Sequence, residues 1–166
     1  MARIVILGCA GTGKTTLARR LARHMGVPVI ILDELWWEHG EDLASFRSDT
    51  ERLHAGGAWV SDGNFASATF LIRLPRATQI VWLEKPRLLC ALRVIARVFR
   101  HDSDHHWRQL PSVLRFIWHF ERVNRPRIER LRRKLGSDVP VIHLSGEAEI
   151  DAFLLSLPKR AAKAAA

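Results

Sequence analysis

The sequence predicts an α/β fold in which a parallel sheet carries helices on both faces. Short apolar segments that read as buried strands alternate along the chain with segments of helical periodicity. Hydrophobic residues make up 48% and charged residues 26% of the chain, which is ordinary for a globular domain. A length of 166 residues suits one domain with a single core.

The predicted strands are short and rich in Val, Ile, Leu or Trp, as strands inside a parallel sheet are. Five are expected, at 3–7, 27–32, 58–61, 78–83 and 140–144. The expected helices cover 16–25, 42–55, 66–73, about 86–100, 111–124, 126–136 and 147–157. Residues 101–110 read as a polar turn, and residues 159–166 as a frayed, disordered tail.

Glycine and proline mark several of these boundaries. Gly56 and Gly57 end the second helix, and Pro75 stops the third. Pro86 suits the first position of the helix after the fourth strand, because its fixed backbone angle and missing N–H fit there.

Residues 8–15 join the first strand to the first helix and read G-x-x-x-x-G-K-[ST], the phosphate-binding P-loop. Glycines let backbone N–H groups turn toward phosphate oxygens, and the start of a helix adds partial positive charge. Lys14 is expected to reach the β- and γ-phosphates, and the Thr15 hydroxyl to bind Mg²⁺. The residues predicted to bind a nucleoside triphosphate are Gly8, Cys9, Ala10, Gly11, Thr12, Gly13, Lys14, Thr15 and Thr16.

Two aspartates directly follow expected strands, Asp33 after the second and Asp62 after the third. Ligands of open parallel sheets bind beyond the carboxyl ends of the strands, so both carboxylates are expected beside the P-loop. A carboxylate there can hold a Mg²⁺ water or accept a proton from an acceptor hydroxyl. We expect Asp62 in the magnesium shell and Asp33 facing the acceptor. The alternative for each is a helix cap or a turn.

Arg93 and Arg97 are spaced i, i+4 on the helix after the fourth strand and so share one face, with Arg100 beyond them. Arginines gathered at one place suit a phosphoryl group in transfer, because charge develops on its oxygens. The alternative is a solvated basic helix face. It stays open also for three arginines whose direction nothing in the sequence fixes, Arg122, Arg125 and Arg127.

Two other groups have both a functional and a structural interpretation. Trp36 and Trp37 follow Asp33 and either line an acceptor pocket or belong to the core. A polar cluster matches no standard spacing of metal ligands, and it consists of His101, Asp102, Asp104, His105 and His106.

The formal net charge of +9 lies in one segment. Residues 87–134 hold 13 Lys and Arg against 4 Asp and Glu, and the rest of the chain is neutral. A basic segment facing a bound triphosphate indicates either phosphate clamping or a nucleic-acid surface.

The chain resembles the P-loop small-molecule kinases related to adenylate kinase, and most of all the small adenylate-kinase-like proteins labelled DNA topology modulation proteins. The resemblance covers nearly the whole chain. Its carriers are the P-loop, the strand end Ile31-Leu32-Asp33, the run Asp62-Gly63-Asn64, and Pro86 followed by Arg93 and Arg97.

The resemblance implies a three-layer P-loop NTPase sandwich with sheet order 2-3-1-4-5. It implies a single kinase-like domain at 1–158, an acceptor-side insert at 34–57 and a helical LID at about 100–125. It also implies an ATP- and Mg²⁺-dependent phosphotransferase. Adenylate kinases continue Asp-Gly with a Pro-Arg that clamps the acceptor phosphate, whereas this chain has Asn64-Phe65-Ala66. The acceptor therefore stays open between a nucleoside monophosphate and a hydroxylated metabolite.

The alternative function is nucleotide-dependent nucleic-acid binding that affects DNA topology, and a third is nucleotide binding without turnover. No apolar run is long enough to span a bilayer, and the first strand leaves no room for a signal peptide. Cys9 and Cys90 do not indicate a disulfide framework. The sequence therefore favours a cytoplasmic protein without a membrane partner, as a monomer or a homodimer.

Overall fold

The computed structural model describes residues 2–40, 42–101 and 104–158, and their side chains except those at 100–106. Its sheet is parallel and has the predicted order β2-β3-β1-β4-β5. The strands are β1 (Arg3–Gly8), β2 (Val29–Ile31), β3 (Trp59–Asp62), β4 (Gln79–Leu83) and β5 (Val141–Leu144). The predicted fold class and strand order are confirmed.

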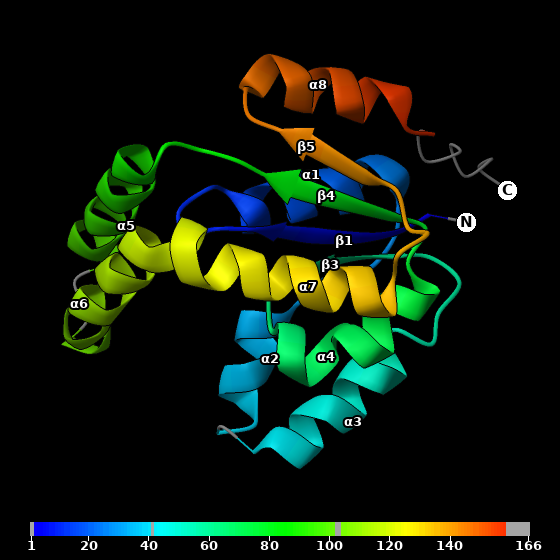
Figure 1. Ribbon diagram of the computed structural model, residues 1–166, viewed down its shortest axis with the longest axis horizontal. Helices are drawn as coiled ribbons and strands as arrows, with labels where there is room; N and C mark the ends of the chain where they lie inside the picture. The colour runs from blue at the N-terminus through cyan, green and yellow to red at the C-terminus, as the bar shows by residue number, and fades with distance from the viewer. Residues whose placement is uncertain (1, 41, 102–103, 159–166) are drawn as a thin grey trace, which may run out of the picture.

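Helices cover both faces of the sheet and make the three layers (Figure 1). On one face α1 (Lys14–Met25) and α8 (Glu147–Ser156) pack on Ile4 and Ile6 of β1. On the other face α4 (Ala66–Arg73) and α7 (Arg125–Leu135) pack on the opposite side chains of β1, such as Val5. Both faces of β1 are buried, which explains why this strand is apolar without alternation.

The second strand is shorter than predicted, and a helix that was not predicted follows it. α2 (Leu32–Glu38) starts directly after β2, so Asp33 lies in the first turn of a helix and not after a strand. Leu32 and Leu35 are both buried, at the spacing of one helix face, and acidic side chains favour a first turn. α3 (Leu43–Leu53) follows, and the Asp42 carboxylate caps it by accepting from the N–H groups of Ala44 and Ser45.

The predicted polar turn at 101–110 is wrong over most of its length. α5 (Arg87–His101) is followed by α6 (Asp104–His119), which runs through Pro111. Leu110, Leu114 and Ile117 recur at helical spacing and pack against the core, and this burial outweighs the hydrogen bond that a proline removes. Figure 1 shows α5 and α6 side by side at the carboxyl ends of the strands.

The break predicted near residue 124 is a wide helical turn instead. A π-helical segment, η2 (Phe120–Asn124), carries the chain from α6 into α7 without a loop. Phe120 is buried in the core, and it fixes this turn against the sheet. The short 3₁₀ turn η1 (Leu74–Arg76) ends α4 at Pro75, as the sequence predicts.

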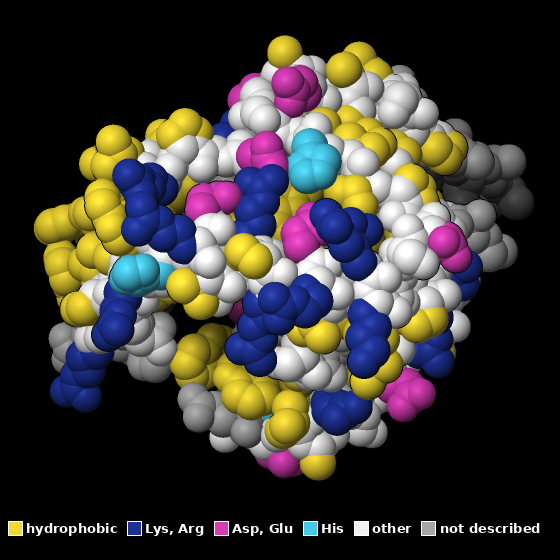
Figure 2. Space-filling model, viewed as in Figure 1, with side chains coloured by type: hydrophobic (Ala, Val, Ile, Leu, Met, Phe, Trp, Pro, Cys, Tyr) yellow, Lys and Arg dark blue, Asp and Glu magenta, His cyan; other side chains and the backbone are white. Residues whose placement is uncertain are grey.

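The surface that carries α6, η2 and α7 shows many Lys and Arg side chains, interrupted by acidic and apolar ones (Figure 2). No helix of the described residues has the length and apolar character needed to cross a membrane. The predicted tail at 159–166, Arg100 and the His/Asp cluster at 101–106 lie outside the residues or side chains that the structure describes.

Candidate active site

The P-loop between β1 and α1 needs glycine because two of its residues touch neighbouring backbone. A Cβ on Gly8 would lie 2.5 Å from the carbonyl oxygen of Leu83, and Gly8 has φ +144°. A Cβ on Gly11 would lie 2.4 Å from the carbonyl oxygen of Cys90, at φ +80°. The loop is therefore wedged between the end of β4 and the first turns of α5, where only glycine fits without strain.

Side chains hold this loop in a closed shape. The Thr12 hydroxyl and the Lys14 ammonium both donate to the carbonyl oxygen of Cys9, at 2.8 and 2.9 Å. The Asn64 side chain brackets Gly8, because its Nδ2 donates to the Gly8 carbonyl at 2.9 Å and its Oδ1 accepts from the Gly8 N–H at 3.3 Å. The loop leads directly into the N-terminus of α1, which favours a bound anion.

A cleft of about 700 Å³ opens above this loop. Its lining holds most of the predicted nucleotide-binding residues, together with Asp33, Arg93 and Arg97. The lining residues are Ala10, Gly11, Thr12, Gly13, Lys14, Thr15, Thr16, Leu17, Arg20, Asp33, Arg93, Val94, Arg97, Glu147 and Ile150. Gly8 and Cys9 are not among them, because Gly8 is buried at the base of the loop and the Cys9 side chain lines a separate pocket.

Thr15 lines the cleft and contacts Asp62, which is buried behind it and does not itself line the cleft. The Thr15 hydroxyl donates to Asp62 Oδ2 at 2.5 Å, while Oδ1 is buried without a hydrogen-bond partner in the described structure. Burial raises the pKa of the Asp62 carboxyl above its ordinary value, and the nearby Lys14 and Thr15 act in the opposite direction. An orphaned carboxylate oxygen beside a hydroxyl fits Mg²⁺, which takes oxygen ligands and is commonly held by one or two carboxylates plus phosphate and water.

No group of three or more His, Cys, Asp or Glu side chains that could hold a metal ion occurs among the described residues. A metal at Asp62 would therefore depend on ligands from the nucleotide and water as well as on the chain.

Arg93 and Arg97 reach the cleft from α5, on the side opposite α1. Arg93 Nη1 donates to the carbonyl oxygen of Thr12 at 3.4 Å and lies 3.9 Å from the position of a Cβ on Gly13. Both arginines are exposed, so their guanidinium groups are available to a ligand in the cleft.

Asp33 lies where the cleft meets a second, smaller pocket of about 200 Å³. Three residues line both cavities, namely Ala10, Lys14 and Asp33. The smaller pocket is completed by Gly63, Asn64, Phe65 and Phe116. The exposed Asp33 carboxylate therefore faces two cavities that lie on either side of the P-loop lysine.

Arg73 supports the site from inside the core and was not predicted. Its guanidinium is fully buried and donates to Ser61 Oγ at 3.1 Å and to the carbonyl oxygens of Gly63 and Asn64, both at 2.9 Å. Burial lowers the pKa of Arg73 to about 9, and the nearby Asp62 opposes this change. Arg73 thereby fixes the backbone that follows Asp62. An arginine eleven positions after an aspartate gives no local signal for this role.

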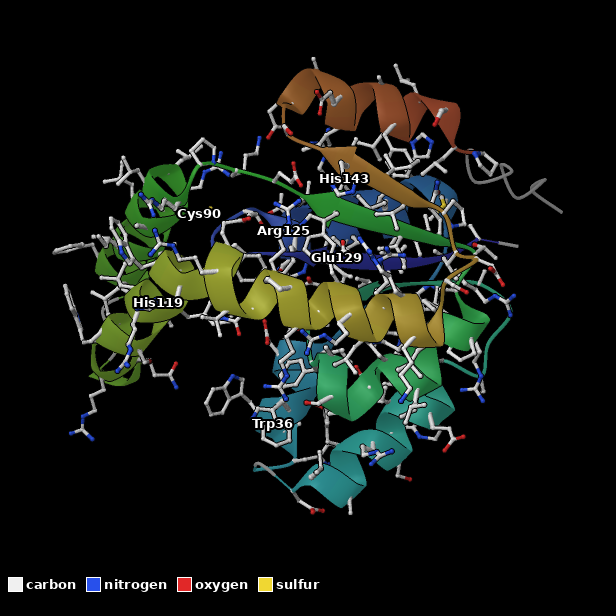
Figure 3. All side chains as sticks on the ribbon, in the orientation of Figure 1. Trp36, Cys90, His119, Arg125, Glu129 and His143 are labelled. Atoms are coloured by element: carbon white, nitrogen blue, oxygen red, sulfur yellow. The ribbon has the colours of Figure 1, made fainter. Side chains whose placement is uncertain are left out.

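The two tryptophans differ in place. Trp36 packs edge-on against Phe46, with ring centroids 5.1 Å apart, and against Phe65 at 5.9 Å (Figure 3). It stands behind the wall of the smaller pocket and belongs to the partly buried core. Trp37 is half exposed and does not line either cavity at the P-loop.

The three arginines of undetermined direction lie outside the cleft. Arg125 forms ion pairs with Glu84 at 2.5 Å and Glu121 at 2.9 Å and lies over the Trp82 ring (Figure 3). Arg122 and Arg127 are exposed on the same side of the molecule, and neither lines the cleft.

The Cys9 and Cys90 side chains lie beside each other beneath the loop, and Cys90 Sγ donates to the carbonyl oxygen of Lys85 at 3.8 Å. The neighbouring Cys9 thiol lowers the pKa of Cys90, with help from the charges of Arg93 and Lys14 and against the effect of burial. The neighbouring Cys90 thiol and burial raise the pKa of Cys9. Cys9 therefore joins the underside of the P-loop to α5.

Comparison with known proteins gives a matching picture of the fold. Residues 3–58, less than half of the chain, match a family model described as an AAA domain (AAA_28). The search of curated proteins found no match.

Solved structures of kinases match over nearly the full chain. A shikimate kinase from Bacteroides thetaiotaomicron has 19% identity and a TM-score of 0.54, with 93% of this chain and 94% of that chain covered. A protein from Chloroflexus aurantiacus provisionally called a kinase has 15% identity and a TM-score of 0.61, with 93% and 95% covered. A sugar kinase from Janibacter sp. HTCC2649 has 17% identity and a TM-score of 0.55, with 93% of each chain covered. The chain therefore has the fold of P-loop kinases.

Proposed function

We propose that this protein is a kinase that transfers the γ-phosphoryl group of Mg²⁺-ATP to a hydroxyl group of a small molecule. The observation that carries the proposal is the meeting of two cavities at Lys14 and Asp33. A donor bound on the P-loop and an acceptor in the smaller pocket would meet there, and holding two reactants in contact is the main task of a kinase.

On the donor side, the P-loop N–H groups and Lys14 bind the phosphates. Thr15 and Asp62 would hold Mg²⁺, which when bound would neutralise negative charge on the phosphates. Arg93 and Arg97 lie across the cleft from α1 and stabilise the charge that develops on the transferring group. α5 and α6 would then act as the LID, with residues 34–57 on the acceptor side.

On the acceptor side, Asp33 accepts the proton of the acceptor hydroxyl. The acceptor oxygen forms a bond to the γ-phosphorus, and the bond from that phosphorus to the β-phosphate oxygen breaks, so ADP leaves. The shikimate kinase and sugar kinase among the structural neighbours support an acceptor of this kind. ATP as the donor and the cytoplasm as the setting belong to the same proposal.

Acceptor-stimulated ADP release tests this function, with matched variants. Lys14→Ala is expected to lower the rate on the order of 10²–10³-fold, and Asp33→Asn on the order of 10²–10⁴-fold. Two exposed residues outside both cavities give the controls, Lys134→Ala and Glu34→Gln. Equal rates for Lys14→Ala and the unmodified protein would exclude a kinase that uses this loop.

Nucleic-acid binding is a second candidate, favoured by the exposed basic side chains on η2 and α7 (Figure 2). They include Arg122, Arg127, Arg130, Arg133 and Lys134. This candidate predicts binding to duplex DNA that weakens steeply with salt, because each phosphate contact releases a counterion. Absence of binding at low salt removes it.

A further inference from the structure

The smaller pocket beside Lys14 and Asp33 is narrow and has aromatic walls. Its volume of about 200 Å³ is below the roughly 300–1,000 Å³ of pockets that hold drug-sized ligands. Phe65 and Phe116 line it from the start of α4 and from α6, and Trp36 packs behind Phe65. Such a space suits a single ring that offers an apolar face to an aromatic side chain.

Of the polar side chains that line this pocket, Asn64 and Lys14 are hydrogen-bonded to the P-loop, and Asp33 is the exception. The Asn64 amide is bonded to Gly8 through both its oxygen and its nitrogen. The Lys14 ammonium also lines this pocket, but it donates to the P-loop carbonyl of Cys9 and, in the proposed function, is taken up by the phosphates of the donor in the cleft. The Asp33 carboxylate is exposed and is left to meet the acceptor.

No arginine is found in the described lining of this pocket. Arg73 follows Asp62 in the sequence, but its guanidinium is fully buried and bonded to Ser61, Gly63 and Asn64. Among the described side chains, a phosphate or carboxylate on the acceptor would therefore find no guanidinium partner. It would lie beside the Asp33 carboxylate, and the Lys14 ammonium in the same lining is shared with the donor phosphates. Like charges placed together without a partner disfavour binding strongly.

We propose that the acceptor is a single-ring hydroxyl compound that carries no anionic group. This inference rests on the proposed kinase function and names the class of its acceptor. It excludes nucleoside monophosphates and ring carboxylates as preferred acceptors, because each brings an anion for which no cationic side chain in the described lining is left unengaged.

Matched pairs of small molecules test the inference by calorimetry on the protein loaded with Mg²⁺ and a non-hydrolysable ATP analogue. One pair is 1,4-cyclohexanediol and 4-hydroxycyclohexanecarboxylate, and the other is methyl glucoside and glucuronate. The uncharged member of each pair is expected to bind at least about tenfold more tightly than the anionic member. Turnover with ATP is then measured for every compound.

A charge variant gives the second arm. Phe116→Arg places a guanidinium in the pocket and is expected to lower the preference for the uncharged member by about tenfold or more. Ser112→Arg adds the same charge one turn earlier on α6, outside the pocket, and is expected to leave the preference unchanged.

The outcomes separate this inference from the kinase proposal. Equal or tighter binding of the anionic members, or no binding by either class, overturns the inference. Anionic members that bind and are phosphorylated overturn the inference and leave the kinase proposal standing. Uncharged members that bind preferentially, with no ADP released, support the acceptor class and count against the kinase proposal.

Discussion

Replacing Asp62 with asparagine should separate the stability of the empty protein from its ability to bind Mg²⁺-nucleotide. Asp62 is 1% exposed, and one of its oxygens accepts from Thr15 while the other is buried without a partner among the described residues. Asparagine has nearly the same size and keeps an oxygen that can accept from Thr15. The substitution therefore removes the buried charge with little change in packing.

The expected gain in the free energy of unfolding follows from the orphaned oxygen. An unpaired buried polar group costs about 1–3 kcal/mol, and more when it is charged. The amide nitrogen of Asp62→Asn would also lack a partner, so the gain is smaller, about 1 kcal/mol. For a chain of this size that corresponds to a rise in Tm of about 2–4 °C without ligand.

With Mg²⁺-nucleotide bound, the unmodified protein is expected to have a higher Tm than Asp62→Asn. A ligand present at about 100 times its Kd stabilises the folded state by about 2.7 kcal/mol, which raises Tm by about 5–11 °C. Asp62→Asn loses the part of this shift that depends on Mg²⁺, because the carboxylate is the proposed metal ligand.

The pH dependence of the free energy of unfolding tests the effect of the buried Asp62 charge independently. Burial raises the pKa of Asp62 above its ordinary value of 3.8, so the folded state holds this proton more strongly than the unfolded chain. The contribution of Asp62 to stability is therefore greatest below pH 3.8 and is lost as the pH rises through the folded pKa. Asp62→Asn lacks this loss.

Thermal unfolding with and without Mg²⁺ and a non-hydrolysable ATP analogue measures both effects. Asp33→Asn, which removes an exposed carboxylate, is the control and should leave the Tm of the empty protein unchanged. A lower Tm for empty Asp62→Asn, or an undiminished shift with Mg²⁺, would refute the reasoning.

Three further substitutions test the support of the site and the core, each by thermal or chemical unfolding. Arg73→Met removes the three hydrogen bonds of a buried guanidinium and should lower the free energy of unfolding by about 3 kcal/mol. The matched control, exposed Arg47→Met, should change it by no more than about 0.5 kcal/mol, and equal effects of the two would contradict this prediction. Burial lowers the pKa of His54 from 6.5 to about 4, so the unfolded chain binds the proton first as the pH falls. The free energy of unfolding should therefore decrease by about 3 kcal/mol between pH 6.5 and 4, and His54→Asn should reduce this pH dependence. Gly11→Ala should cost about 1–3 kcal/mol and weaken nucleotide binding, whereas Gly56→Ala, with open space around its Cβ, should do neither.

The sheet could be predicted from the sequence because its strands are buried on both faces. A short, continuous apolar run such as Ile4–Leu7 is typical of a strand covered on both sides, and the motif at 8–15 fixes where the first strand ends. The strand order came from the resemblance to known kinases and not from periodicity. Asp33, Arg93 and Arg97 line the cleft, while the roles assigned to them stay predictions.

The errors lie where tertiary packing overrides local composition. α6 begins in a polar stretch because residues further along it are buried. η2 replaces the predicted break between two helices because Phe120 is fixed in the core. Arg73 could not be predicted, since its partners are mainly backbone carbonyls on another segment. The direction of the Cys9 side chain, away from the cleft, likewise depends on α5.

The continuity of α6, η2 and α7 decides how the hairpin of α5 and α6 can move. α6 continues through η2 into α7 without a loop. A movement of this hairpin over the nucleotide would therefore have to bend this continuous helix, which is anchored in the core by the buried Phe120. We expect such bending to occur at η2, where π-helical hydrogen bonds replace the regular α-helical ones. α7 packs on α4, and α4 carries Arg73, which holds the backbone after Asp62. The same bending would therefore also displace α4 and reach the backbone beside Asp62.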